Sequence, residues 1–183
     1  MEGEKGARSP MDPNYLKCEE NSEVMEDATQ YRSLLGGLLY LAVAARLNIA
    51  NAAAILGRKF CGPTQKDWTA AKRTLHYLKQ TSDYYLIVGG DPDQHLSGYS
   101  DADWAGDSAD RKSTSGMVFF FDGSAISWAR RKRYAIVHGG QVYGPQRVWL
   151  RRLLSDLSQP QAQPTMIRED NQGCLSFVKC ERK

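Results

Sequence analysis

The hydrophobic pattern of this 183-residue chain changes its period at Gly89–Gly90, and this change constrains the fold more than any other feature. In the segment 63–79, before the two glycines, the apolar residues recur at helical spacing. These residues are Trp68, Ala71, Leu75 and Leu78. Thr64 and Asp67 have the spacing of a capping box and predict where this helix begins. Residues 30–60, rich in Ala, Leu and Ile, predict one or two further helices around Gly36–Gly37.

After the two glycines the pattern changes to strands. Strand-forming runs cover residues 96–101 and 114–128. Asp122–Gly123 interrupts the second run and is typical of a tight hairpin turn. The sequence therefore predicts three strands in this region, the last two joined as a hairpin.

Helical and strand patterns alternate in the rest of the chain. Pro145 opens a helical pattern with one leucine-rich face, and a Pro/Gln-rich linker follows at 159–164. The word TMIRED at 165–170 predicts a short strand, and residues 172–179 predict a last helix. The order of two or three helices, three strands, a helix, a strand and a helix predicts an α/β or α+β fold.

The first 28 residues differ from the rest in polarity and charge. Residues 1–30 carry eight acidic and three basic side chains, which leaves 21 basic and 13 acidic side chains for the remaining residues. We expect residues 1–28 to form a disordered acidic arm. Residues 29–90 are then expected to form a helical segment, and residues 91–183 a second domain. The basic body fits an anionic partner such as nucleic acid, although solvated surfaces have similar compositions.

Several classes of protein are excluded by composition. The apolar run Leu34–Ala45 is twelve residues long, too short for a span of a roughly 30 Å hydrocarbon core, so we expect no membrane span. No basic start followed by an apolar stretch precedes it, so no conventional signal peptide is visible. The four cysteines form no CxxC pair, which argues against a structural zinc site.

Acidic residues gather at two places that could serve a metal ion. The word GYSDADWAGDSAD contains Asp101, Asp103, Asp107 and Asp110, and the word REDNQG contains Glu169 and Asp170. Magnesium prefers oxygen ligands, commonly one or two carboxylates completed by water or phosphate. Aspartates in loops also stabilise turns and helix ends, and spacing alone favours that simpler interpretation.

Several words of the sequence resemble one family when taken in order. SDADWAGD (100–107), RKSTSG (111–116), AISW (125–128), WLRRLL (149–154) and DNQG (170–173) resemble the RNase H region of Ty1/copia-type retrotransposon polyproteins. YRSLLGGLLYLA (31–42) and PTQKDWTAAKRTLHYLK (63–79) resemble the connection segment before that region. The resemblance implies a mixed RNase H-like sheet with flanking helices, truncated here and preceded by a helical connection segment. It also implies that Asp101 and Asp170 are the family's metal-binding aspartates.

The departures from this family predict loss of catalysis. The family carries a catalytic Glu at the start of a helix between AISW and WLRR, whereas the interval Ala129–Val148 contains neither Asp nor Glu. Because the interval is short and contains Gly139–Gly140, we expect this helix to be missing. The chain also ends at Lys183, before the family's last acidic residue. We therefore expect no nuclease activity, no required cofactor, and at most weak binding of Mg²⁺ by Asp101 and Asp170.

A basic cluster follows the predicted hairpin. Arg130, Arg131, Lys132 and Arg133 are consecutive, and such runs serve nuclear import or phosphate contact. A solvated loop after a strand is the equally weighted alternative.

The whole chain also resembles secreted RxLR-type effectors of oomycete plant pathogens, although it contains no Arg-x-Leu-Arg word. That resemblance implies a protein secreted into plant cells, acting in the nucleus or cytoplasm to suppress defence or cell death. Its partner would be a host protein or nucleic acid, with no obligate small-molecule ligand. The alternatives are a residual magnesium-dependent ribonuclease H of a retrotransposon and an inert retroelement relic.

Overall fold

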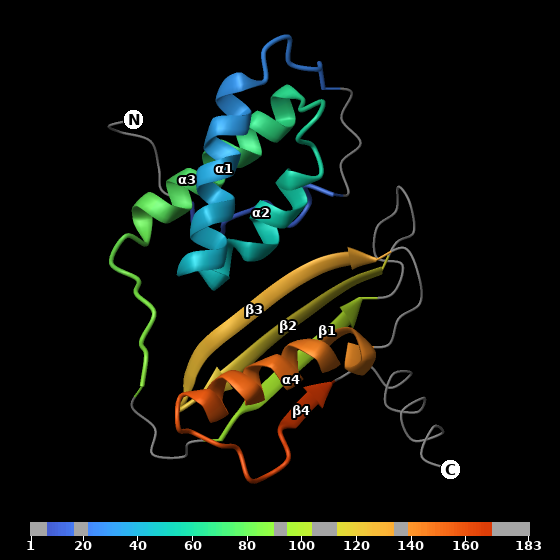
Figure 1. The fold of residues 1–183 in the computed structure, drawn as a ribbon. Coiled ribbons are helices and arrows are strands. Elements are labelled where there is room, and N and C mark those ends of the chain that lie inside the picture. The colour runs from blue at the N-terminus through green and yellow to red at the C-terminus, as the bar shows by residue number, and fades with distance from the viewer. Residues whose placement is uncertain (1–6, 17–21, 90–94, 104–112, 134–138, 170–183) are drawn as a thin grey trace. The chain divides into compact units, whose positions relative to one another are not determined.

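The computed structural model describes residues 7–16, 22–89, 95–103, 113–133 and 139–169. The chain divides into two compact units, a helical unit (Met1–Leu86) and a sheet unit (Ile87–Lys183). Their described residues form four α-helices and a mixed four-stranded sheet, an α+β fold (Figure 1). None of the described helices combines the length and apolarity that crossing a membrane requires.

The helical unit is built from α1 (Thr29–Ala44), a 3-10 turn (Leu47–Ile49), α2 (Ala50–Gly57) and α3 (Gln65–Gln80). Its first helix runs straight through Gly36–Gly37, so the expected pair of helices meets at the 3-10 turn instead. The capping box predicted for α3 is present: Asp67 N–H donates to Thr64 Oγ1, and Asp67 Oδ2 accepts Thr64 N–H at 2.8 Å. Each of these bonds gives a partner to a backbone N–H group that has no partner within the helix.

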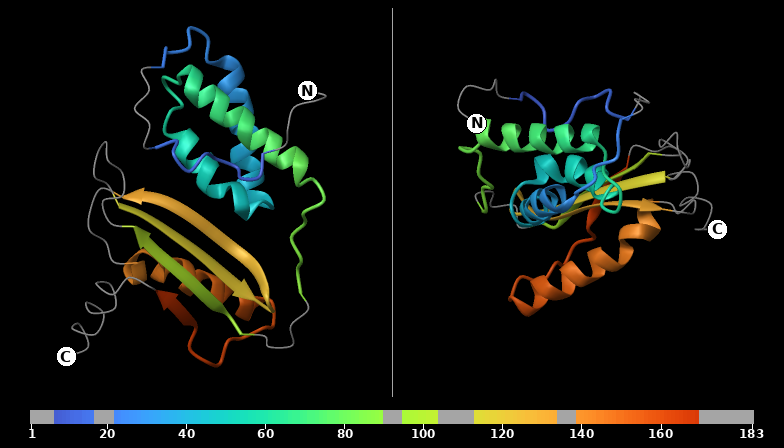
Figure 2. Two further views of the ribbon diagram at one scale, coloured as in Figure 1. Left: turned by 180° about the vertical axis from the view of Figure 1, so that it is seen from behind. Right: turned by 90° about the horizontal axis from the view of Figure 1, so that it is seen from above.

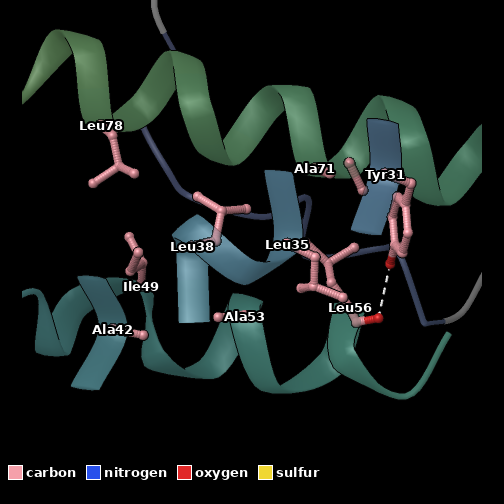
Figure 3. Packing of buried hydrophobic residues seen from close by; sticks show 10 residues of the cluster. Tyr31, Leu35, Leu38, Ala42, Ile49, Ala53, Leu56, Ala71 and Leu78 are labelled. Carbon is pink, nitrogen blue, oxygen red and sulfur yellow. Dashed lines mark hydrogen bonds between the residues drawn. The ribbon is translucent and has the colours of Figure 1, made fainter. Parts of the chain in front are cut away.

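One apolar cluster joins the three helices of this unit. Figure 3 shows α1 directing one stripe of side chains toward α2 and α3. The buried members are Tyr31, Leu35, Leu38, Ala42, Ile49, Ala53, Leu56, Ala70, Ala71 and Leu78. The Tyr31 hydroxyl crosses this core and donates a 2.7 Å hydrogen bond to the Leu56 carbonyl, so its polar end is satisfied.

The described parts of the first 28 residues pack on the helical unit, in contrast to the disordered arm expected for residues 1–28. Met11 and Tyr15 pack against the apolar cluster, and the Pro10 carbonyl accepts a 2.9 Å hydrogen bond from the Thr74 hydroxyl. Val24 forms an antiparallel bridge with Thr64. The polar composition of this segment predicted disorder because the segment has no large apolar face to bury. The contacts that hold it use single side chains and backbone groups, which composition does not reveal.

Tyr15 is the deepest polar anchor of this arm. Its hydroxyl donates a hydrogen bond to Oδ1 of Asp67, a carboxylate that is 3% exposed. Burial, and then the hydrogen bond to Asp67, raise the pKa of Tyr15 above its usual value. Burial raises the pKa of Tyr31 in the same way. The arm and the capping box of α3 therefore share one carboxylate.

The sheet unit contains β1 (Ser97–Asp103), β2 (Ser113–Phe121), β3 (Ser124–Arg133), α4 (Gly139–Asp156) and β4 (Met166–Glu169). The strand order is β3-β2-β1-β4, with β1 antiparallel to β2 and parallel to β4. The predicted turn joins β2 to β3, and both Asp122 and Gly123 have positive φ angles of 54° and 72°. The helix expected at 172–179 lies outside the described residues.

Helix α4 covers one face of the sheet, as Figures 1 and 2 show. Leu150 and Leu154 of α4 pack with Leu96 and Phe119 in a second apolar cluster. Gly98 lies beneath this cluster, where an added Cβ would come within 2.9 Å of the Phe119 ring. Because alternate residues of a strand face opposite sides, Tyr99 and Asp101 lie on the other face of β1.

Candidate functional site

Asp101 lies on a central strand of the sheet. It belongs to β1, which pairs with β2 on one side and with β4 on the other, and its register partner on β2 is Gly116. The Asp101 side chain is exposed, on the face opposite α4. The structure thus presents one carboxylate at an open position, where it could contact a cation or a polar ligand.

The other predicted metal ligand is not described. Asp170 lies outside the described residues, which end in this region at Glu169. Glu169 pairs with Ser100 of β1 and accepts a hydrogen bond from the buried Ser100 hydroxyl. Within the described ranges, no group of three or more His, Cys, Asp or Glu side chains is placed to hold a metal ion. Of the two predicted metal ligands, the described residues thus include Asp101.

The helix expected to be missing before WLRRLL is in fact present in part. Helix α4 begins at Gly139, six positions before the predicted start at Pro145, and it includes that proline. Glycine and proline disfavour helix, but the packing of Leu150 and Leu154 on the sheet stabilises the element as a whole. What this region lacks is the acidic side chain, because Ala129–Val148 contains neither Asp nor Glu.

The basic run lies in a strand instead of a loop. β3 continues through Arg133, so all four basic residues pair with β2. Their register partners are Gly116, Ser115, Thr114 and Ser113, in the order from Arg130 to Arg133. The structure thus places a continuous basic segment at one end of an outer strand, next to uncharged residues.

An aromatic and cationic cluster on the open face of the sheet was not predicted. The rings of Tyr99 and Phe120 meet edge to face, with centroids 5.8 Å apart. The Arg168 guanidinium lies 5.2 Å from the Tyr99 ring centroid and donates a hydrogen bond to its hydroxyl. A shallow hollow of about 470 Å³ lies beside these three residues and Met166. Tyr99 and Arg168 are 69 positions apart, and only the parallel β1–β4 pairing brings them together.

No family model matches the chain, and no solved structure matches it. Known proteins do match. The chain is 36% identical over 157 residues to the retrovirus-related Pol polyprotein from transposon TNT 1-94 of Nicotiana tabacum. This match covers 81% of the chain but 12% of that polyprotein. It is 33% identical over 157 residues to the corresponding polyprotein from transposon RE2 of Arabidopsis thaliana, of which it spans 11%.

A shorter relative is matched over most of its own length. The chain is 40% identical over 106 residues to Secreted RxLR effector protein 161 of Plasmopara viticola. This match covers 58% of the chain and 75% of that effector. The Pol polyprotein relatives confirm the resemblance that the sequence predicted. The chain is therefore similar over 81% of its length to copia-type retrotransposon Pol polyproteins, of which it spans 11–12%, and it shares with Secreted RxLR effector protein 161 a region that makes up 75% of that effector.

Proposed function

We propose that this chain is a non-catalytic RNase H-like protein, derived from a retroelement, that acts as a secreted effector by binding inside plant host cells. One observation carries the proposal: the region that it shares with Secreted RxLR effector protein 161 at 40% identity accounts for 75% of that effector. In this role the protein suppresses plant defence or cell death in the nucleus or cytoplasm. Its partner is a host protein or nucleic acid, and it requires no small-molecule ligand.

The arrangement of the sheet unit supports an RNase H-like origin. A mixed sheet with β1 at its centre is covered on one face by α4, and Asp101 projects from the other face. The relation to retrotransposon Pol proteins supports the same origin.

The chemistry of the site supports loss of catalysis. Attack on a phosphodiester by paired magnesium ions needs carboxylates that bridge them. The interval Ala129–Val148 before WLRRLL contains no acidic residue, and of the two predicted ligands the described residues include Asp101 and not Asp170. Each ~1.4 kcal/mol lost from transition-state stabilisation lowers the rate about tenfold. Magnesium binding by Asp101 and Asp170 is therefore weak and without catalytic consequence.

The effector role is tested by expressing the chain in leaf cells and triggering defence-linked cell death. The wild-type chain is expected to reduce cell death. A Gly98→Val variant, which crowds the buried Phe119 ring, is the destabilised comparison and should show a weaker effect because less folded chain accumulates. Equal cell death with the wild-type chain, the variant and an empty vector would contradict the proposal and favour an inert relic.

Nuclear delivery by the basic run is tested in the same cells. Replacing Arg130, Arg131, Lys132 and Arg133 by Ala should shift a fluorescent fusion from nucleus to cytoplasm if the run directs import. Unchanged nuclear accumulation would remove this role from the run while leaving suppression of cell death to be judged separately.

A residual magnesium-dependent ribonuclease H is the second candidate, and the exposed carboxylate of Asp101 is the observation that favours it. The test uses an RNA–DNA hybrid with labelled RNA, with and without Mg²⁺. Our proposal predicts no cleavage by the purified chain. Magnesium-dependent cleavage that stops in an Asp101→Asn variant would overturn it.

A further inference from the structure

We propose that the outer edge of β3 binds an extended acidic segment of a partner protein by strand addition. This inference names the chemistry of the partner that the proposed binding role requires, and so it rests on that role. It depends on where β3 lies in the sheet and on the charge of its last four residues.

β3 is an outer strand of the sheet. It is ten residues long and stands at one end of the strand order. Its inner side pairs with β2, and no other strand of the described residues pairs with its outer side. An outer strand of this kind presents a row of backbone donors and acceptors that a further strand can pair with.

The last four residues of β3 are all basic. The residues Arg130–Arg133 extend over ~13 Å at ~3.3 Å per residue. Their register partners on β2 are a glycine, two serines and a threonine, which carry no charge. An incoming acidic strand would place opposite charges directly across the edge, which stabilises pairing, whereas a basic strand would be repelled.

A strand edge with basic residues fits an acidic polypeptide better than it fits a nucleic acid. A nucleic acid offers phosphate oxygens, which accept hydrogen bonds, but a strand edge also presents carbonyl groups that need donors. Another polypeptide strand supplies both kinds of group at matching intervals. A receptor that reads the run as a detached peptide would first have to separate it from β2.

The first half of β3 defines the rest of the ligand. Ile126 is 37% exposed and Trp128 is half-buried, so apolar side chains accompany the backbone here. Antiparallel addition places the amino end of a ligand beside the basic run. The fitting segment is therefore acidic in its first half and rich in β-branched residues in its second.

The test measures binding of a synthetic peptide to the purified full-length chain by fluorescence anisotropy. The probe has ten residues, four Glu followed by alternating Thr and Val, with a dye at one end. The wild-type chain should bind it. The affinity should fall as salt rises from about 0.05 to 0.5 M because screening weakens exposed charge pairs.

Two variants with equal net charge distinguish position from overall charge. Reversing Arg130, Arg131, Lys132 and Arg133 to Glu should weaken binding roughly tenfold or more, because four cross-strand pairs become repulsive. Reversing four exposed basic residues elsewhere, Arg8, Lys59, Lys79 and Arg152, should leave the affinity within about twofold. Circular dichroism checks the fold of both variants, and the salt series on the wild-type chain keeps the test decisive if the first variant unfolds.

A chemical control on the peptide tests the backbone contribution. Two further peptides are methylated on alternate backbone nitrogens, one at the odd and one at the even positions. Both keep every charge, but one of them loses the N–H donors that strand addition needs. One of these peptides should lose binding. Equal binding of both methylated peptides and the parent would overturn strand addition.

Three further results would also overturn the proposal. The first is that the wild-type chain does not bind the peptide. The second is that a single-stranded nucleic acid of ten nucleotides binds more tightly and displaces the peptide. The third is that the chain associates with itself through the basic run while the peptide does not bind. If the peptide fails but the chain still suppresses cell death, the partner class is wrong and the effector role stands. If the peptide binds but cell death is unchanged, the reverse holds.

Discussion

The helical unit and the sheet unit bury their apolar residues in different ways. In the helical unit three helices and parts of the arm surround one cluster, while Tyr40 and Val43 on the outer side of α1 are exposed. In the sheet unit α4 covers one face, while Tyr99, Asp101 and Ile126 are exposed on the sheet. The difference teaches that helices from one unit can enclose a core from several sides, whereas a single helix over a sheet encloses a core on one face only.

The largest expected effect comes from the core of the helical unit. Leu35→Ala removes a fully buried side chain from the cluster and should cost about 2–5 kcal/mol of unfolding free energy. Hydrogen exchange measured by mass spectrometry should show lost protection in α1, α2 and α3, with protection retained in β1 and β2.

The matched control lies on the same helix. Leu39 is 38% exposed, and Leu39→Ala should change stability by well under half as much. Equal loss of protection in both units of the Leu35→Ala variant would contradict the separation of the two cores.

The next effect tests the covered face of the sheet. Gly98→Val places a branched side chain against the Phe119 ring, which is itself 2% exposed and cannot move aside. Overpacking of this kind should cost about 1–3 kcal/mol, measured by urea unfolding. Gly116→Val on β2 is the control, because a Cβ there meets nothing within 4 Å. A destabilisation by Gly116→Val as large as that by Gly98→Val would show that the two faces are equally packed.

A smaller, pH-dependent effect tests the anchoring of the arm. Burial raises the pKa values of Tyr15 and Tyr31 in the folded chain, while tyrosines of the unfolded chain ionise near pH 10. Above pH 10 the folded state therefore binds more protons than the unfolded state. The free energy of unfolding should be constant in this respect below pH 10 and should fall as the pH rises beyond it.

Single substitutions assign this pH dependence. Tyr15→Phe should reduce the loss of stability between pH 10 and 11 in a urea titration, because one raised pKa is removed. Tyr85→Phe is the control, since Tyr85 is 82% exposed. A steeper loss in the Tyr15→Phe variant than in the wild-type chain would show that the arm does not hold this hydroxyl in its neutral form.

Local signals in the sequence predicted much of the fold. Thr64 and Asp67 located the start of α3, and Asp122–Gly123 located the hairpin, because each signal acts within four residues. Packing between distant segments decided the rest. Leucines on α4 stabilise a helix that begins before Pro145, where propensity alone predicted its start, and pairing with β2 extends β3 through the basic run.

The same distinction applies to the candidate site. Asp101 was predicted to be a metal ligand from the motif SDADWAGD, and it lies on the face of β1 opposite α4. Asp170 lies outside the described residues. The pairing of Arg168 with Tyr99 could not be predicted, because neither residue has a local pattern that indicates the other. Register between β1 and β4 is a property of the folded sheet, set by segments far apart in the chain.

The smallest expected effect concerns that open face. Arg168→Ala removes an exposed cation from the Tyr99 ring and should cost only about 0.5–1 kcal/mol of unfolding free energy. Arg152→Ala, at an exposed position of α4, should cost less, and urea unfolding of both variants under the same conditions makes the comparison. If Arg168→Ala instead destabilises the chain as much as Gly98→Val, the open face contributes to folding as strongly as the face beneath α4. A loss near the expected value means that the Tyr99–Arg168 contact can change with little cost to the fold, which is what a surface kept for binding requires.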